Sequence, residues 1–391
     1  MPLFDETARI ETRPRRQNEG AFDYMNISAR PGIAAIRELL EGWFERVPLM
    51  AKADVRSRFR SFDAAQHASA FFELYWHELL CRSGYEVEVH PTVPNAETNP
   101  DFLASRNGVA LLYVEVTLAM PPGDAAADRR FAELHDTLDR MDSPDYFLHV
   151  EYRGSPQGNM RGRLIRERLE RWLRDLDHAE ITRLYAQQAY DDLPSLNWSE
   201  QGCTLTFTPA PKGAESRGQP GVRPIGVAMP VELRELRTYE DIRAAIEGKA
   251  SKYGELHHPL LVAVNVLDDF CDHDDVLSAL FGEEQIIAAR HVDGSFTHGW
   301  GRAANGAWRG HRGPRNALVS AVSVIHQLSP SNLRHRDVEV FHNPWTERPL
   351  SLDSLLLPQV TFSMPDGRMH RHEGTSHALL LEIPEAWPPQ D

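Results

Sequence analysis

Apolar residues recur at intervals of three and four in residues 31–44 and again in residues 63–82. This spacing is typical of helices that bury one face. Asp63 starts the second segment and belongs to the residue types that favour the N-cap position of a helix. Further helices are predicted at residues 128–141, 161–176 and 238–253, and a short one that follows residues 268–275 and ends at Phe281-Gly282.

Short alternating or apolar runs, bounded by Gly, Pro, Asn and Asp, predict strands. Asn107-Gly108 is a strong signal for a two-residue hairpin turn, which would join two of these strands. A further hairpin is predicted near residues 365–367. The predicted strands span residues 85–90, 101–104, 109–119, 146–152, 203–209, 224–228, 260–266, 318–325, 338–341 and 379–383.

Two segments lack such a pattern. Residues 1–30 are polar and mixed in character, and we expect them to form a lead-in arm that is only partly ordered. Residues 291–315 are rich in Gly, Arg, His and Trp, and we expect a loop there. The helices and strands together predict an α/β (α+β) fold.

Composition narrows the class of protein. The chain has 391 residues, 41% of them hydrophobic and 25% charged, which is enough for a sizeable core. Its three cysteines form no CxxC pair, so a disulfide framework or thiolate zinc site is not expected, and a reducing cytoplasm is the simplest location. No apolar run is long enough to predict a membrane span. The net charge of −15 argues against broad attraction to nucleic acid.

Glu115 is the first candidate for chemistry. It lies within the apolar run Leu111–Ala119, where Leu112, Val114 and Val116 would share the opposite face of the strand. A carboxylate in a strand covered on both sides is costly unless it is paired or bound to a metal. The alternative is an edge strand with Glu115 facing water.

Three other residues complete the candidate site. Asp101 precedes the predicted hairpin and could lie near Glu115, although a turn aspartate is the plainer interpretation. Glu73 lies at the border of the apolar stripe of helix 63–82, and a surface position is equally consistent with the pattern. Lys249 and Tyr253, four residues apart, would share one helical face.

Taken in chain order, Glu73, Pro100-Asp101 and Glu115-Val116-Thr117 resemble the PD-(D/E)xK nuclease superfamily, also called restriction-endonuclease-like. The resemblance implies an αβββαβ core, with a mixed sheet flanked by helices. It divides the chain into an N-terminal arm and helical region, the first part of the nuclease-like core, an α/β insertion, the second part of the core, and a C-terminal extension packed on the core. These parts span residues 1–60, 61–120, 121–235, 236–267 and 268–391.

The chain departs from the superfamily at Thr117, which stands where a lysine is expected. In some branches the cation has moved to the following helix, and Lys249-Ala-Ser-Lys-Tyr253 is similar in spacing to the Gln-x-x-x-Tyr pattern of a related branch. The resemblance therefore implies that Lys249 has the lysine's role, supported by Thr117, Lys252 and Tyr253. Short motifs such as His342-Asn-Pro-Trp345 look like those of an uncharacterised bacterial branch.

The resemblance implies metal-dependent hydrolysis of phosphodiester bonds. Asp101, Glu115 and the Val116 carbonyl would hold one Mg²⁺ or Mn²⁺ ion, and Glu73 would support a second ion or bind through water. The expected activity is that of an endonuclease on DNA, in bacterial defence or DNA processing. Analogy with enzymes that cut both strands also predicts a homodimer.

The segment 300–315 suggests nucleic-acid contacts, because it combines Arg with Trp and Gly. An ordinary surface loop explains the composition equally well. The candidate contacts are Trp300, Arg302, Trp308, Arg309 and Arg312.

Two other functions fit the same residues. Thr117 favours a catalytically inactive nucleic-acid-binding or sensor protein on the same fold. A glycosidase with two carboxylates is the other alternative, although the expected order of elements differs from the barrel folds common in that class.

Overall fold

The computed structural model describes residues 1–94, 98–121, 123–219, 222–230, 237–250, 252–253, 256–268, 271–290, 295–364 and 367–390. The chain divides into two compact units. Unit 1 consists of Met1–Arg13, Gly20–Pro121 and Arg237–Asp391, and unit 2 of Pro14–Glu19 and Pro122–Leu236. Each unit has its own sheet and its own hydrophobic core.

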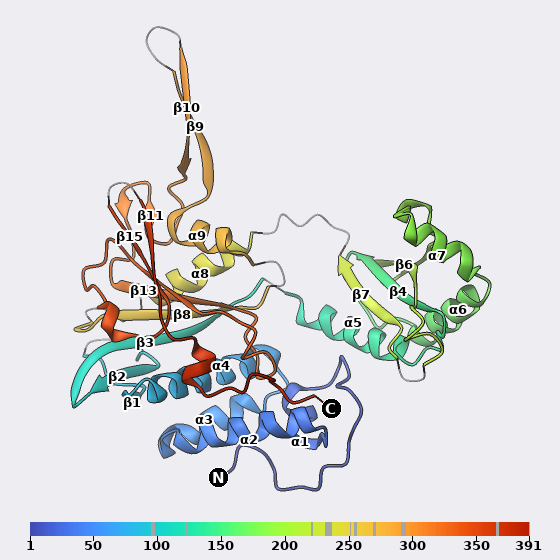
Figure 1. Cartoon of the computed structure of the whole chain (residues 1–391), viewed down its shortest axis with the longest axis horizontal. Helices are drawn as coiled ribbons and strands as arrows, with labels where there is room; N and C mark the ends of the chain where they lie inside the picture. Colours follow the sequence, from blue (N-terminus) through green and yellow to red (C-terminus); the bar gives the residue numbers. More distant parts are fainter. Residues whose placement is uncertain are drawn as a thin grey trace. The chain divides into compact units, whose positions relative to one another are not determined.

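Unit 1 is built on an eight-stranded mixed sheet flanked by helices (Figure 1). Its first three strands form an antiparallel meander, and β8 then lies parallel to both β3 and β13. β13–β14 and β15–β16 are antiparallel pairs, whereas β14 and β15 are parallel. In spatial order the strands are β1 (Glu86–Val89), β2 (Phe102–Arg106), β3 (Val109–Ala119), β8 (Leu260–Val266), β13 (Val319–His326), β14 (Glu339–His342), β15 (Gln359–Phe362) and β16 (Met369–His372).

The turn between β2 and β3 has the predicted form. Asn107 and Gly108 have φ angles of 53° and 73°, and two successive positive values define the type I′ turn of a two-residue hairpin. The turn pairs Arg106 with Val109, and a register shift between Ala104 and Ser105 then pairs Phe102 with Val114. Residue 101, just before β2, is thereby brought beside residue 115.

Helices cover both faces of this sheet (Figure 1). One core packs α1–α4 and α10 against one face, and the other core packs α8 and α9 against the opposite face. Asp63 caps α4 as predicted, because its carboxylate accepts the N–H groups of Ala65 and Gln66. The helices are α1 (Ala21–Ile27), α2 (Pro31–Arg46), α3 (Leu49–Phe59), α4 (Ala64–Arg82), α8 (Thr238–Ala250), α9 (His273–Phe281) and α10 (His377–Leu380), with a short 3₁₀ turn, η2 (Leu352–Ser354).

Unit 2 contains a four-stranded sheet in the order β5, β6, β4, β7. Ile165, Leu169 and Leu173 of α6 are buried in its core at the helical spacing that the sequence shows. The prediction missed β5 and α7. The elements are α5 (Ala125–Leu138), β4 (Tyr146–Arg153), α6 (Gly162–Arg174), α7 (His178–Ala186), η1 (Tyr190–Asp192), β5 (Leu196–Glu200), β6 (Cys203–Pro211) and β7 (Ile225–Pro230).

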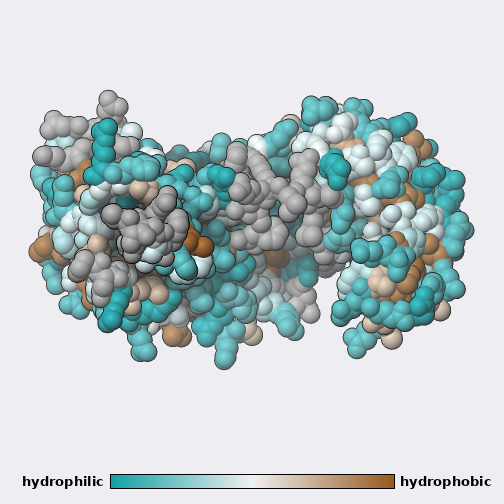
Figure 2. Space-filling model, turned by 90° about the horizontal axis from the view of Figure 1, so that it is seen from above, coloured by the Kyte–Doolittle hydropathy of each residue, from teal (hydrophilic) through white to brown (hydrophobic). Residues whose placement is uncertain are grey.

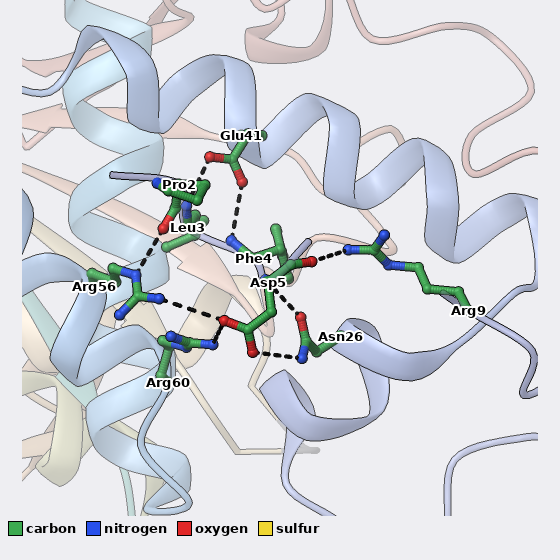
Figure 3. A network of polar contacts seen from close by, with 9 residues as sticks. All are labelled: Pro2, Leu3, Phe4, Asp5, Arg9, Asn26, Glu41, Arg56 and Arg60. Atoms are coloured by element: carbon green, nitrogen blue, oxygen red, sulfur yellow. Dashed lines mark hydrogen bonds and ion pairs between the residues drawn. The ribbon is translucent and has the colours of Figure 1, made fainter. Parts of the chain in front are cut away.

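The expectation that residues 1–30 form a partly ordered arm is wrong. Leu3 and Phe4 are buried in the core of unit 1, and Glu41 of α2 accepts both of their backbone N–H groups, at 2.7 Å and 3.1 Å. Asp5 is held by polar contacts with the side chains of Asn26, Arg56 and Arg60 (Figure 3). Two consecutive apolar residues show no periodicity, so only their tertiary partners reveal that the segment is anchored.

Two further expectations are wrong. Residues 291–315 are not simply a loop, because they include all of β10 (Phe296–Arg302), which pairs with β9 (Glu284–Arg290). They also include the short pair β11 (Arg309–Gly310) and β12 (Gly313–Pro314). Residues 379–383 form no strand, since Ser376 caps a helical turn at α10 and Leu381 and Ile383 then fill the core. Of the hairpin predicted near residues 365–367, Pro365 and Asp366 lie outside the described residues.

The visible face in Figure 2 is mostly hydrophilic, with hydrophobic residues in small separate areas. Among the helices that the structure describes, none combines the length and apolar character needed to cross a membrane.

Candidate active site

Glu115 lies in the middle of β3, between β2 and β8, and is 2% exposed. It points to the same side of the sheet as Tyr113, toward α8, while Val114 and Val116 face the opposite core. One carboxylate oxygen accepts Nζ of Lys249, and the other accepts the backbone N–H of Asp101 at 3.1 Å. These partners make the burial of a charge at this position tolerable.

Asp101 directly precedes β2 and returns the contact. Its Oδ2 accepts the backbone N–H of Val116 at 2.8 Å, while its own N–H donates to Glu115. The Glu115 carboxylate thus accepts the N–H of Asp101 itself. The Asp101 carboxylate accepts the N–H of Val116, the residue that follows Glu115. This reciprocal pair fixes both side chains across the β2–β3 hairpin, as the sequence analysis required of a site built from them.

The electrostatics of Asp101 are strongly perturbed. Burial, followed by the charges of Glu115 and Glu73, raises the pKa of the Asp101 carboxyl to about 8. The N–H of Val116 and the charge of Lys249 act in the opposite direction. Burial and the two neighbouring acids therefore favour the protonated form of Asp101.

Lys249 reaches this group from α8, which packs against β3 and β8. Its ammonium group forms the ion pair with Glu115, whereas Lys252 is exposed. Tyr253 is buried, and burial together with its hydrogen bond to Glu115 raises the pKa of its hydroxyl group. The helix as described ends at Ala250, before the predicted end at residue 253.

Glu73 is close enough to influence Asp101 but is engaged elsewhere. Its two carboxylate oxygens accept Nη1 and Nη2 of Arg58, each at 2.6 Å, and Ser69 Oγ donates to it at 3.3 Å. Arg58 also pairs with Asp54, and these contacts raise the pKa of its guanidinium group despite its burial.

Arg58 is a site residue that the sequence patterns above did not predict. The signal was the spacing of Ala51, Val55 and Phe59, which are four residues apart and form the buried face of α3. This face places α3 beside α4, so that Arg58 and Glu73 meet.

A small pocket joins Glu73 to Asp101 and contains two further residues that the sequence analysis missed. His90 follows β1 in a left-handed conformation with φ of 52°, and its N–H donates to the Asp101 carbonyl at 2.9 Å. Burial lowers the pKa of His77. The pocket is lined by these four residues together with Val47, Ala51, Val55, Leu74, Val89 and Phe102.

Within the described part of the chain, no three or more His, Cys, Asp or Glu side chains are grouped as they would be to hold a metal ion. Of the three expected metal ligands, Asp101 and Glu115 lie side by side. The third, Glu73, is paired with Arg58. Mg²⁺ commonly uses one or two protein carboxylates and retains waters, so the Asp101–Glu115 pair matches its ligand chemistry. Thr117 lies on the Glu115 side of β3 and is partly buried.

The candidate nucleic-acid contacts divide in two. Trp300, Arg309 and Arg312 are exposed. Arg302 donates to the Gly282 carbonyl and pairs with Glu284. The assignment of Trp308 is wrong, because its side chain is fully buried and makes an edge-on ring contact with Phe281. No base could stack on it without unfolding this part of the core.

Comparisons of the chain with protein-family models, with curated proteins and with solved structures found no match. The residues and their geometry are thus the basis for assigning a function.

Proposed function

We propose that this chain is a Mg²⁺-dependent nuclease that hydrolyses phosphodiester bonds in DNA, acting as an endonuclease in bacterial defence or DNA processing. One observation carries the proposal: Asp101 and Glu115 engage each other across the β2–β3 hairpin, and Lys249 pairs with Glu115 from the next helix of unit 1. Two carboxylates and one ammonium group from separate segments form one cluster.

The order of the elements supports the same proposal. A helix that carries Glu73 leads into three antiparallel strands that carry Asp101 and Glu115. The next elements of unit 1 are α8, which carries Lys249, and β8, which is parallel to β3. This is the αβββαβ order implied by the resemblance to restriction-endonuclease-like proteins. Lys249 reaches Glu115 directly, which supports its assignment to the role that Thr117 cannot fill.

Asp101 and Glu115, with the Val116 carbonyl, would hold the ion. A divalent ion supplies Lewis acidity toward a phosphate oxygen and lowers the pKa of a bound water. The raised pKa of Asp101 suits such a ligand, because positive charge beside it would favour its ionised form. Lys249 would stabilise negative charge on the phosphate, a contribution typically worth roughly 10²–10³ in rate.

The test is cleavage of supercoiled plasmid, single-stranded DNA and RNA, each with Mg²⁺, with Mn²⁺ and with chelator. We expect Asp101→Asn and Glu115→Gln to abolish metal-dependent cleavage. Glu86→Gln, at an exposed position on β1, serves as the matched control and should cleave like the parent protein. Circular dichroism verifies that each variant is folded. Cleavage that persists in both site variants refutes the assignment.

A second candidate function has its own support. Glu73 and Glu115 already pair with Arg58 and Lys249, so these two carboxylates are satisfied by protein cations. This favours a metal-free nucleic-acid-binding protein on the same fold. Calorimetry separates the two candidates: the second predicts no heat of binding with Mn²⁺ and an affinity for duplex DNA that chelator leaves unchanged, whereas the first predicts Mn²⁺ binding that Asp101→Asn removes.

A further inference from the structure

Strands β9 and β10 form a separate two-stranded sheet, which we name the arm. Seven residues of each strand are paired in antiparallel register, from Glu284 with Arg302 to Arg290 with Phe296. The arm follows α9 and stands clear of the eight-stranded sheet of unit 1 (Figure 1). An isolated two-stranded hairpin is at best marginally stable in water, so the arm is expected to need a partner.

Large apolar side chains are exposed on both faces of the arm. Ile286 and Trp300 are register partners on one face, and they are 63% and 78% exposed. Ile287 is on the other face and 51% exposed, and a Cβ atom at Gly301 would lie 2.3 Å from its Cδ1. Gly301 thus lets Ile287 lie flat across the neighbouring strand. Both faces of the arm therefore expose large apolar side chains to solvent, a feature that marks interaction surfaces.

Among the residues that the structure describes, β9 pairs with β10 alone, so its outer edge is open to pairing. Its central residues Gln285-Ile286-Ile287-Ala288 include no charge and no proline, the two devices that usually keep an exposed strand from adding another. We propose that the arm pairs with the arm of a second copy of this chain, edge to edge, to form a four-stranded sheet around a two-fold axis. In such an antiparallel pairing the centres of the two β9 strands lie opposite each other. Because these centres are uncharged, no like charges face each other there.

The charge distribution disfavours nucleic acid as the partner of the arm and permits a second copy. Glu284 and Arg302 form an ion pair at the base of the arm with an N–O distance of 3.0 Å, so Arg302 offers little charge to a phosphate. The whole chain carries −15, and two copies therefore repel each other. Seven residues span about 24 Å at about 3.4 Å each. That exceeds the screening length of about 8 Å at physiological salt, so arms can meet while the acidic bodies stay apart.

The size of the contact sets its expected strength. A standard protein interface uses about 20–30 residues from each side. Edge-to-edge pairing brings only β9, a strand of seven residues, of each copy into direct contact, which falls short of that number. We therefore expect a dimer that dissociates on dilution. It should dissociate more readily at low salt, where the screening length of about 30 Å at 0.01 M exceeds the length of the arm and the acidic bodies repel each other.

Sedimentation velocity of the full chain, from about 1 to about 200 µM and at low and high salt, tests the inference. Ile286→Lys with Ile287→Lys adds charge to the edge of β9. The matched control is Leu49→Lys with Met50→Lys, an adjacent apolar pair on α3 that is 84% and 86% exposed. We expect the parent and the control to dimerise with similar dissociation constants, and the arm variant to dissociate at least about tenfold more readily.

Other outcomes overturn the inference. A parent chain that stays monomeric over the whole concentration range contradicts the inference. A control whose dimer is weakened as much as that of the arm variant contradicts it as well. Fluorescence anisotropy measures the affinity of each variant for duplex DNA. If the arm binds nucleic acid instead, the added lysines increase this affinity. If the arm pairs with its copy, the affinity changes no more in the arm variant than in the control. These readouts measure mass and affinity, so they do not depend on nuclease activity.

Discussion

Replacing Asp101 by Asn removes a buried ionisable group and keeps the shape of the side chain. The amide oxygen of Asn can still accept the N–H of Val116, so the β2–β3 contact is retained. In the parent protein the folded state raises the pKa of this carboxyl from 3.8 to about 8. The folded chain therefore holds a proton on Asp101 in a pH range where the unfolded chain has released it.

The sign and size of the effect follow from this difference in bound protons. A folded state that binds more protons loses stability as pH rises, and the loss extends from about pH 4 to about pH 8. One group contributes at most about 1.4 kcal/mol per pH unit. Because Asp101 and Glu115 interact, we expect a total of roughly 2–5 kcal/mol, with Asp101→Asn more stable than the parent by that amount at pH 8.

Urea denaturation of both proteins at pH 5, 6, 7 and 8, without divalent ions, measures this difference. The two free energies of unfolding should converge toward pH 5 and diverge as the pH increases. Added Mn²⁺ should then stabilise the parent at pH 8 and leave Asp101→Asn unchanged, because the ion would favour the ionised carboxylate. A variant that is less stable than the parent at pH 8, or a difference that does not change with pH, refutes the reasoning.

Two further predictions concern packing and charge. Lys249→Met leaves the carboxylate of Glu115 buried without its ion pair. It should therefore lower the free energy of unfolding by about 3 kcal/mol, as measured in the same denaturation assay. Lys249→Arg keeps the positive charge and should lower the free energy of unfolding much less. A cost below about 1 kcal/mol for Lys249→Met would mean that solvent reaches Glu115. Leu3→Ala should cost about 2–5 kcal/mol, since its side chain is fully buried, while Ile10→Ala at an 87% exposed position should change the free energy by less than about 0.5 kcal/mol. Equal effects of the two substitutions would contradict the anchoring of the N-terminal segment.

Local patterns predicted much of the secondary structure. The strand at 109–119 and the Asn107-Gly108 turn follow from residues that are adjacent in sequence, because apolar alternation and left-handed turn residues act over a few positions. The segment near Leu3 and the arm did not follow in this way. Burial of Leu3 depends on Glu41 and the core beside it, and pairing of β9 with β10 depends on a register that composition alone does not specify.

For the candidate site, the sequence determined which acids could matter, and only the tertiary structure decided how their charges are distributed. Glu115 is recognisable because a carboxylate within an apolar strand demands a partner. Contacts between distant segments decide that Glu115 pairs with Lys249 and that Glu73 pairs with Arg58. The burial and the neighbouring acids that raise the pKa of Asp101 likewise come from the tertiary structure. Coulomb interactions vary with separation and burial, and neither quantity is encoded in the order of residues along the chain.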